Sequence, residues 1–301
     1  MIYTVTLNPA IDYVVQLPQG LTPGAINRSQ AEEYQFGGKG INVSNVLQTL
    51  SQESVALGFI AGFTGQALEA GLQDKGLVTR FISVAQGHTR INVKVKGREE
   101  TEINGNGPVI EDADMQKLFG QLDALRSGDV LVLSGSIPGC LEADTYAKLL
   151  SRMEGKGVCT IVDTAGDALL CTLPYRPFLI KPNLQELDAL FDTALTSEDK
   201  IVECAGILQQ RGAQNVLVSM GGDGALLLDE AGQIHRASCP QGTVINSVGA
   251  GDSMVAGFLA GFLQTGDYDH ALKLGIAAGS ATAFALVLAS KESIDEQFSQ
   301  L

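Results

Sequence analysis

Short apolar runs alternate with helix-length amphipathic segments along most of the chain. β-branched or leucine-rich runs predict strands at 2–7, 54–60, 129–134, 158–163, 178–181 and 215–220. Apolar residues at helical spacing predict helices near 41–51, 65–75, 112–126, 143–155, 184–191 and 198–211. Because strands that are apolar throughout bury both faces, this alternation predicts an α/β fold with a mostly parallel central sheet and helices on both faces.

One region departs from this rhythm. Residues 88–107 alternate apolar and polar side chains around Gly97, which predicts an antiparallel hairpin with one solvated face. Residues 10–36 have similar strand-and-turn character. We therefore expect a single domain over 1–301 that carries a small separate β-sheet built from about 10–36 and 88–107.

Composition narrows the classes of function. The chain has 301 residues, 45% of them hydrophobic, and a formal net charge of -14. This charge opposes broad attraction to nucleic acid or to an anionic membrane, so we expect neither as a partner. An anionic small molecule would need a local set of basic side chains and backbone N–H donors.

The cysteines and the chain start indicate a reducing compartment. Five cysteines, with no CxxC pair, suggest neither a disulfide framework nor a zinc site. The N-terminus reads as a strand and not as a signal peptide, so we expect a cytoplasmic protein. The apolar stretches at 254–263 and 274–289 are interrupted by small or polar residues and predict buried helices.

The first segment with candidate chemistry is GGKGINV, residues 37–43. Glycines at a helix start let a ligand approach exposed N–H groups, and Lys39 adds a compact positive charge. A flexible turn with a solvated lysine is the alternative, because a lone Gly-Lys cluster is weakly specific and the P-loop spacing is missing.

The second segment is KPNLQE, residues 181–186, directly after an apolar run. Asn183 and Glu186 have the spacing of a helix capping box, which is one interpretation. The other is that their oxygens hold Mg²⁺ or its waters near phosphates, since Mg²⁺ takes few protein ligands.

The third segment is SMGGDGAL, residues 219–226, which also follows an apolar strand. Ligands of open α/β sheets bind beyond the carboxyl ends of the strands, where this glycine-rich loop would lie. A nucleotide could approach its backbone closely, and an ordinary strand–turn–strand explains the glycines equally well.

The fourth segment is NSVGAGDS, residues 246–253, followed by the apolar periodicity of a helix that begins near Asp252. Gly249, Ala250 and Gly251 leave the first-turn N–H groups unobstructed, and the helix dipole favours an anion there. Asp252 either serves only as a favourable negative charge at the helix start or accepts a proton beside a bound phosphate.

Together, GGKGINV, KPNLQEL, VSMGGDGA and VGAGDSMVAGF resemble the PfkB/ribokinase family of sugar kinases in order and separation, over essentially the whole chain. TVTLNPAIDYVV, HTRINVKVK, ETEINGNGP and LSGSIPG are most similar to its phosphosugar branch, which holds 1-phosphofructokinase and tagatose-6-phosphate kinase. The resemblance implies a ribokinase-like fold whose small sheet acts as a lid, with ATP as co-substrate and Mg²⁺ as cofactor.

The resemblance also implies site roles. Asp252 is expected to be the catalytic base, with Gly249, Ala250 and Gly251 as the anion hole, and Asp12 is expected to bind sugar hydroxyls. Expected sugar-phosphate contacts are Gly37, Gly38, Lys39, Asn42, Arg90, Asn92 and Ser136, with Arg28 behind them. Expected ATP contacts are Lys181, Asn183, Ser219, Gly221, Gly224 and Ser247, and the expected metal contacts are Asn183 and Glu186.

The expected reaction is phosphorylation of the 6-hydroxyl of fructose 1-phosphate by ATP. Tagatose 6-phosphate as substrate is the nearest alternative, and a non-catalytic regulator that binds a sugar phosphate is a more distant one. A dinucleotide-dependent dehydrogenase is disfavoured because no GxGxxG opens a helix after a strand. An exposed lid sheet further suggests a homodimer.

Overall fold

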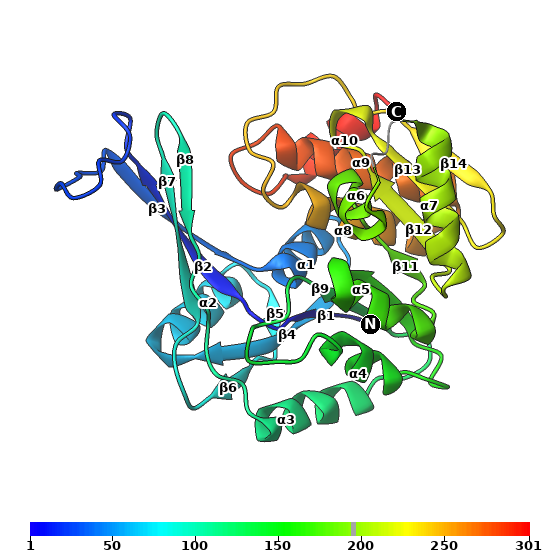
Figure 1. Cartoon of the computed structure of the whole chain (residues 1–301), viewed down its shortest axis with the longest axis horizontal. Coiled ribbons are helices and arrows are strands. Elements are labelled where there is room, and N and C mark those ends of the chain that lie inside the picture. The colour runs from blue at the N-terminus through cyan, green and yellow to red at the C-terminus, as the bar shows by residue number, and fades with distance from the viewer. Residues whose placement is uncertain (194–196) are drawn as a thin grey trace.

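A ten-stranded sheet forms the centre of the molecule (Figure 1). The computed structural model describes residues 1–193 and 197–301. The strands run in the order β14-β13-β12-β11-β10-β9-β1-β4-β5, and β6 also pairs with β4. All neighbours from β12 to β5 are parallel, whereas β13 and β14 add an antiparallel edge. The strands are β1 (Ile2–Thr6), β4 (Ser54–Ala61), β5 (Val78–Thr79), β6 (Ile82–Val84), β9 (Val130–Ser134), β10 (Cys159–Asp163), β11 (Leu179–Ile180), β12 (Asn215–Ser219), β13 (Ala225–Leu228) and β14 (Ile234–Ala237).

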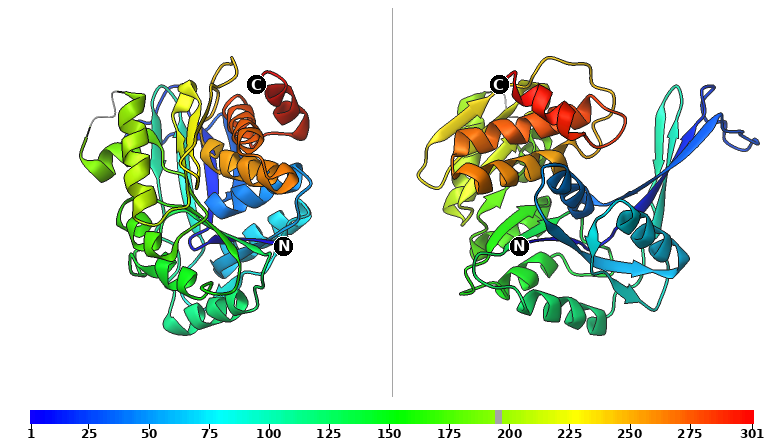
Figure 2. Two further views of the ribbon diagram at one scale, coloured as in Figure 1. Left: turned by 90° about the vertical axis from the view of Figure 1, so that its right-hand side faces the viewer. Right: turned by 180° about the vertical axis from the view of Figure 1, so that it is seen from behind.

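Helices cover both faces of this sheet, as the two turned views show (Figure 2). Alternate residues of one strand serve the two layers: Leu131 and Leu133 pack in one core and Val130 and Val132 in the other. One layer holds α3 (Asp112–Asp123), α4 (Thr145–Ser151), α5 (Gly166–Thr172), η1 (Leu173–Tyr175), α6 (Leu184–Phe191) and α7 (Glu198–Gln210), and the other holds α1 (Lys39–Thr49), α8 (Ala250–Thr265), α9 (Tyr268–Ala283) and α10 (Lys291–Phe298). A third apolar cluster joins α1 and β4 to α2 (Gly62–Asp74).

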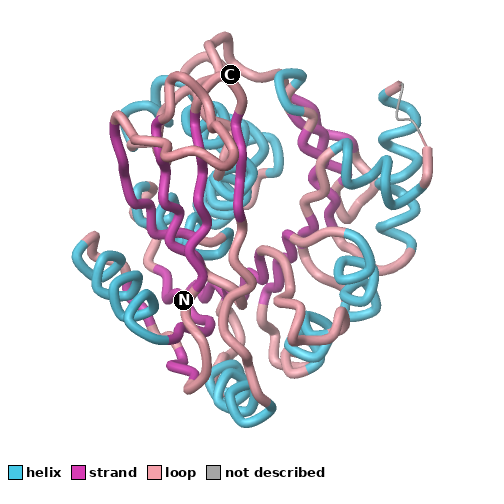
Figure 3. Tube along the Cα trace, turned by 60° about the vertical axis from the view of Figure 1, so that its left-hand side comes forward, coloured by secondary structure: helices cyan, strands magenta, loops and turns pink. Residues whose placement is uncertain are grey.

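A second, four-stranded sheet stands out from this body (Figures 1 and 3). Its order is β3-β2-β7-β8, and β2 pairs parallel with β7 while both outer pairs are antiparallel. Its strands are β2 (Ala10–Gln16), β3 (Ala31–Gly37), β7 (Arg90–Lys96) and β8 (Glu100–Ile103). The separate small sheet that the sequence predicts is therefore present, and the hairpin turns at 97–99 as expected.

Most predicted elements occur within a few residues of their expected positions, but several short or edge elements were missed. The short helices α5 and η1, the last helix α10 and the strands β5, β6 and β14 had no prediction. The buried helix predicted at 274–289 spans Tyr268–Ala283 instead. It begins earlier because Asp267 caps it by accepting a hydrogen bond from the His270 N–H at 2.7 Å, and it ends before Leu286 and Val287, which are 71% and 57% exposed. Among the described residues, no helix has both the length and the hydropathy to cross a membrane.

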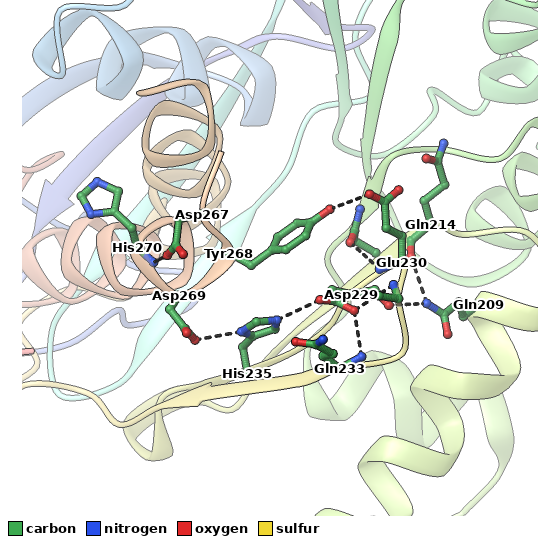
Figure 4. A network of polar contacts seen from close by, with 12 residues as sticks. Gln209, Gln214, Asp229, Glu230, Gln233, His235, Asp267, Tyr268, Asp269 and His270 are labelled. Carbon is green, nitrogen blue, oxygen red and sulfur yellow. Dashed lines mark hydrogen bonds and ion pairs between the residues drawn. The ribbon is translucent and has the colours of Figure 1, made fainter. Parts of the chain in front are cut away.

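An imidazole bridges the antiparallel edge to the helical layer (Figure 4). His235 on β14 lies 2.8 Å from Asp269 of α9 through Nδ1 and 3.0 Å from Asp229 through Nε2. The ring also packs against Tyr268, with centroids 5.7 Å apart. These contacts fix β14 against the start of α9.

Candidate active site

The candidate site lies at the carboxyl edge of the main sheet. Strand β1 lies between β4 and β9. The sheet is extended on one side of β1 by β4 and on the other side by β9, and this reversal of direction is a topological switch point. Ligands of open α/β sheets bind at such points. The loops that follow β9, β10, β11 and β12 contribute side chains to two cavities at this edge.

The first cavity has a volume of about 520 Å³ and lies beside the second sheet. Its lining combines apolar residues with polar and basic ones and includes Gly38, Lys39, Arg90 and Ser136. A Cβ on Gly38 would lie 2.6 Å from the Thr6 side chain, and this residue has φ of 137°, so the close approach of the loop to β1 requires glycine. Four of the predicted sugar-phosphate residues therefore share one cavity.

Two further polar groups of this cavity were not predicted from the sequence. The Asn8 Oδ1 and the Ser134 Oγ are buried and have no hydrogen-bond partner within the described residues. Buried polar atoms are nearly always paired in folded proteins, so unpaired ones in a cavity wall indicate a site that is completed by a ligand or water.

The second cavity has a volume of about 750 Å³ and lies between α8, α9 and the loops after β11 and β12. Its lining includes the predicted Asn183, Ser219, Gly221 and Ser247. It also includes Ala250 and Gly251 from the first turn of α8. The glycine-rich loop and the start of α8 thus face one space.

Asp252 is in the first turn of α8 and is only 5% exposed. The Asn42 Nδ2 donates a hydrogen bond to its Oδ2 at 2.8 Å, so α1 holds the carboxylate in place. Burial first, and then the negative charge of Asp163, raise the pKa of Asp252 to about 7. Asn42, predicted as a sugar-phosphate contact, is thereby a partner of Asp252.

The buried carboxylate of Asp163, at the end of β10, was missed by sequence reasoning. Its Oδ1 lies 3.2 Å from the Lys181 Nζ and its Oδ2 lies 3.5 Å from the Lys39 Nζ. Burial opposes its ionisation, but the two ammonium groups outweigh burial and lower its pKa. Asp163 ends the strand VCTIVD, and only the fold brings it to lysines far away in the sequence.

Lys39 and Lys181 share the carboxylate of Asp163 as their ion-pair partner. Burial alone would lower the pKa of Lys39, but the charges of Asp163, Asp252 and Glu186 outweigh burial and raise it. Lys181 is 4% exposed, and its Nζ would lie 3.3 Å from a Cβ placed on Gly251. The two ammonium groups therefore concentrate positive charge beside the start of α8 in a strongly acidic protein.

Asn183 and Glu186 form the capping box of α6. The Glu186 N–H donates to the Asn183 Oδ1 at 2.8 Å, and the Asn183 N–H donates to the Glu186 Oε2 at 2.9 Å. Neither of these two bonds uses the Glu186 Oε1, which is a hard oxygen donor. Within the described residues, no group of three or more His, Cys, Asp or Glu could enclose a metal. The donors present fit a Mg²⁺ that keeps most of its own waters.

Ten of the predicted site residues line neither cavity, namely Asp12, Arg28, Gly37, Asn42, Asn92, Lys181, Glu186, Gly224, Gly249 and Asp252. Arg28 is exposed on the loop between β2 and β3. Figure 1 shows this loop at the far end of the second sheet. The sequence reasoning grouped it with Lys39 by charge, but the β2–β3 hairpin carries it away from its own chain's cavity. Gly224 has φ of 93°, and a Cβ there would lie 2.1 Å from the Ala237 carbonyl oxygen, so it is required by the turn into β13.

Asp12 and Asn92 lie on the second sheet, one row outward from Arg90. The register pairs Ala10 with Arg90 and Asp12 with Asn92, and alternation along β7 puts Arg90 and Asn92 on one face. The Asn92 Nδ2 donates to the Asp12 Oδ1 at 2.9 Å. Because Arg90 lines the first cavity, this face of the sheet borders it.

A buried carboxylate at a helix start, with two cavities and a pair of lysines around it, defines a two-substrate transferase of the open α/β class. The model of the pfkB family carbohydrate kinases matches residues 5–288. The chain belongs to this family, and its fold is ribokinase-like.

Individual relatives are similar over nearly their full length. The 1-phosphofructokinase of Bacillus subtilis is 46% identical over 98% of this chain and 97% of its own. The D-tagatose-1-phosphate kinase of Bacillus licheniformis is 38% identical over 100% of this chain and 98% of its own. The structure of phosphofructokinase-2 from Escherichia coli in complex with fructose-6-phosphate superposes with a TM-score of 0.91, at 30% identity, over 99% of this chain and 98% of the other.

Proposed function

We propose that the protein transfers a phosphoryl group from ATP to the 6-hydroxyl of fructose 1-phosphate, giving fructose 1,6-bisphosphate and ADP. The observation that carries this proposal is the buried Asp252 at the start of α8: it follows Gly251, which lines the second cavity, and it interacts electrostatically with Lys39, which lines the first. The similarity to the 1-phosphofructokinase of Bacillus subtilis supports the choice of substrate.

In this reaction Asp252 accepts the proton of the attacking hydroxyl. A pKa of about 7 suits a general base at neutral pH, because a substantial fraction is ionised and still basic enough to take the proton. The hydrogen bond from Asn42 fixes which carboxylate oxygen remains available. The oxygen of the deprotonated hydroxyl forms the new bond to phosphorus, and ADP leaves with the electrons of the broken bond.

The start of α8 and the two lysines stabilise the transferring group. The Ala250 N–H donates to the Ser247 carbonyl oxygen at 3.2 Å, which shapes the loop before the helix. We propose that the Gly251 N–H and Lys181 face the charge that spreads over the moving phosphoryl group. Lys39 and Arg90 would bind the phosphate already on the sugar, with Ser136 as a neutral partner.

The nucleotide is proposed to occupy the second cavity, against the loop that contains Ser219 and Gly221. Mg²⁺, bound with ATP and held through Asn183 and Glu186, would neutralise phosphate charge. The second sheet would close over the first cavity as a lid and exclude water that could otherwise accept the phosphoryl group.

The tagatose alternative keeps a specific observation in its favour, the 38% identity to a D-tagatose-1-phosphate kinase. That relative and the 1-phosphofructokinase both act on sugars named as 1-phosphates. A phosphate on carbon 1 is therefore the feature that we propose for the substrate, ahead of tagatose 6-phosphate.

A coupled assay of ADP release tests the proposal. Fructose 1-phosphate, tagatose 1-phosphate, tagatose 6-phosphate and fructose 6-phosphate are compared by kcat/KM with ATP and Mg²⁺. We expect fructose 1-phosphate to have the highest value. A higher kcat/KM for either tagatose phosphate would show that this sugar phosphate, and not fructose 1-phosphate, is the substrate. Binding of fructose 1-phosphate with no ADP release would indicate a regulator.

We also propose that a second copy of the chain packs on the second sheet. The face opposite Asp12 carries Tyr34, Ile91 and Ile103, which are 67%, 40% and 59% exposed. Contiguous apolar side chains on a sheet face of a monomer mark an interaction surface. A symmetric dimer would cover the same face of both copies.

A further inference from the structure

Lys94 is an unusually buried charge on the second sheet. It lies on β7 on the same face as Arg90 and Asn92, two residues beyond Asn92, and is only 8% exposed. A lysine is rarely buried to this extent unless its ammonium group is paired. Its burial on a sheet that projects from the body therefore calls for a partner.

Two carboxylates surround the ammonium group of Lys94. Its Nζ lies 3.6 Å from the Asp12 Oδ2 and 3.4 Å from the Glu102 Oε1. Asp12 comes from β2 and Glu102 from β8, so Lys94 joins three strands of the sheet. The cluster carries one more negative than positive charge.

Asp12 is held from two sides by residues of β7. Asn92 donates to its Oδ1 at 2.9 Å and is itself fixed by the Gly105 N–H, which donates to the Asn92 Oδ1 at 3.2 Å. Lys94 lies near the other oxygen, Oδ2, at 3.6 Å. The Asp12 side chain still has 18% of its surface exposed, so its remaining lone pairs can accept hydrogen bonds from a ligand.

We propose that Lys94 is a positioning residue for sugar binding: it holds the Asp12 carboxylate in the orientation that accepts hydroxyl groups of the substrate. This inference rests on the proposed function, in which Asp12 receives the hydroxyl-bearing part of the sugar phosphate. Lys94 itself does not touch the substrate. The ligand class is a polyhydroxylated phosphate ester whose hydroxyls face Asp12 and whose phosphate lies towards Lys39 and Arg90.

The chain offers a matched control on the same strand. Lys96 is the next residue on the same face, and it pairs with Glu100 of β8 at 4.0 Å, as Lys94 pairs with Glu102. Within the part of the chain that the structure describes, Lys96 makes no ion pair with Asp12. Lys94→Met and Lys96→Met therefore make the same chemical change and remove the same type of cross-strand pair, but only the first affects Asp12.

The experiment measures fructose 1-phosphate binding by calorimetry and turnover by ADP release. For Lys94→Met we expect Kd and KM for the sugar phosphate to rise by about 10-fold or more, with KM for ATP unchanged, because a charge-assisted contact to the sugar is misplaced. For Lys96→Met we expect less than about a 2-fold change, since exposed pairs of this kind contribute little. Lys94→Arg, which keeps the charge, should recover most of the binding.

A double-mutant cycle with Asp12→Asn separates positioning from a purely structural role. If Lys94 acts through Asp12, adding Lys94→Met to Asp12→Asn weakens sugar binding no further. Equal effects of the two lysine variants, or additive effects of Lys94→Met and Asp12→Asn, would overturn the inference. Loss of ADP release in the wild-type protein, with sugar binding and its dependence on Lys94 retained, would instead overturn the proposed function.

Discussion

At the residue scale, Asp252 is both an acidic residue at a helix start and a candidate proton acceptor, two roles that the sequence alone presents as alternatives. The helix start that would explain an acidic residue in the first turn of α8 also supplies N–H groups beside it. Burial and the charge of Asp163 work against ionisation, and their effect exceeds that of the Asn42 hydrogen bond and of the Lys39 and Lys181 charges, so the pKa of Asp252 rises. The carboxylate is therefore too costly in this environment to be only a helix-end charge.

The first prediction concerns this carboxylate. Asp252→Asn should lower kcat by about 10²–10⁴, the range typical of a lost general base, while ATP binding measured by calorimetry stays nearly unchanged. In the wild type, the base is active when deprotonated, so kcat/KM should rise with pH through about 7 and then level off. Wild-type turnover in the variant, or a pH-independent rate between about pH 6 and 8, would contradict the role of Asp252.

The second prediction concerns Asp163, whose negative charge raises the pKa of Asp252. Asp163→Asn removes this charge but keeps the shape, so the ascending limb of the pH–rate profile should move to lower pH. The same change leaves Lys39 and Lys181 without their shared partner, and we expect KM for both substrates to increase. A profile that keeps its midpoint would show that Asp163 does not influence the base.

At the element scale, His235 couples the edge strand β14 to the start of α9 (Figure 4). The C-terminal half of α9 lines the second cavity. Both ring nitrogens face carboxylate oxygens, so both can donate only when the ring is protonated. Burial lowers the pKa of His235, but the bonds and charges of Asp229 and Asp269 outweigh it and raise the pKa. Tyr268 and Glu230 are the other titratable groups around this contact.

The third prediction follows from the sign of that shift. The folded protein binds this proton more tightly than the unfolded chain, so the stabilisation is complete below about pH 6.5, the unfolded value, and is lost as pH rises through the raised pKa. Asp269→Asn should therefore lower Tm more at about pH 6 than at about pH 9. Asp295→Asn, at an exposed position on α10, serves as the control and should show no such pH-dependent difference.

The elements were predicted from the sequence more completely than the contacts between them. Runs such as DVLVLS are apolar on both strand faces, and the two cores use both faces, which is why the parallel sheet was predictable. α5 was missed because it is short and follows a strand without a periodic apolar stripe. Asp163 and the Asn42–Asp252 bond were missed because they depend on residues that only the sheet order brings together.

At the scale of the whole molecule, the positive groups are few and are placed where anionic substrates would bind. The chain carries a formal net charge of -14, yet Lys39, Lys181 and Arg90 gather around the two cavities. The general field of such a protein repels phosphates, so binding has to depend on these local cations and on N–H groups. Specificity for phosphorylated ligands then follows from geometry at short range.

The two faces of the second sheet have different chemistry, and this difference underlies the last prediction. One face presents Arg90, Asn92 and Lys94 towards the cavity side, while the other presents Tyr34 and Ile103 to solvent. We expect the protein, with a chain mass of 31.6 kDa, to have the mass of a dimer in light scattering after size exclusion. Ile103→Asp should shift this mass towards the monomer, because a symmetric interface would bury the new charge twice.

A control for this experiment lies on the edge of the main sheet. Val78 is 54% exposed on β5, so Val78→Asp introduces the same charge on a similarly exposed strand, away from the second sheet. It should leave the dimer mass unchanged. A monomeric wild type at micromolar concentration, or equal dissociation by both variants, would contradict the second sheet as the interface. Dissociation of the dimer by Ile103→Asp alone would instead show that the apolar face of the second sheet contacts a second copy, while its polar face lies towards the substrate cavity.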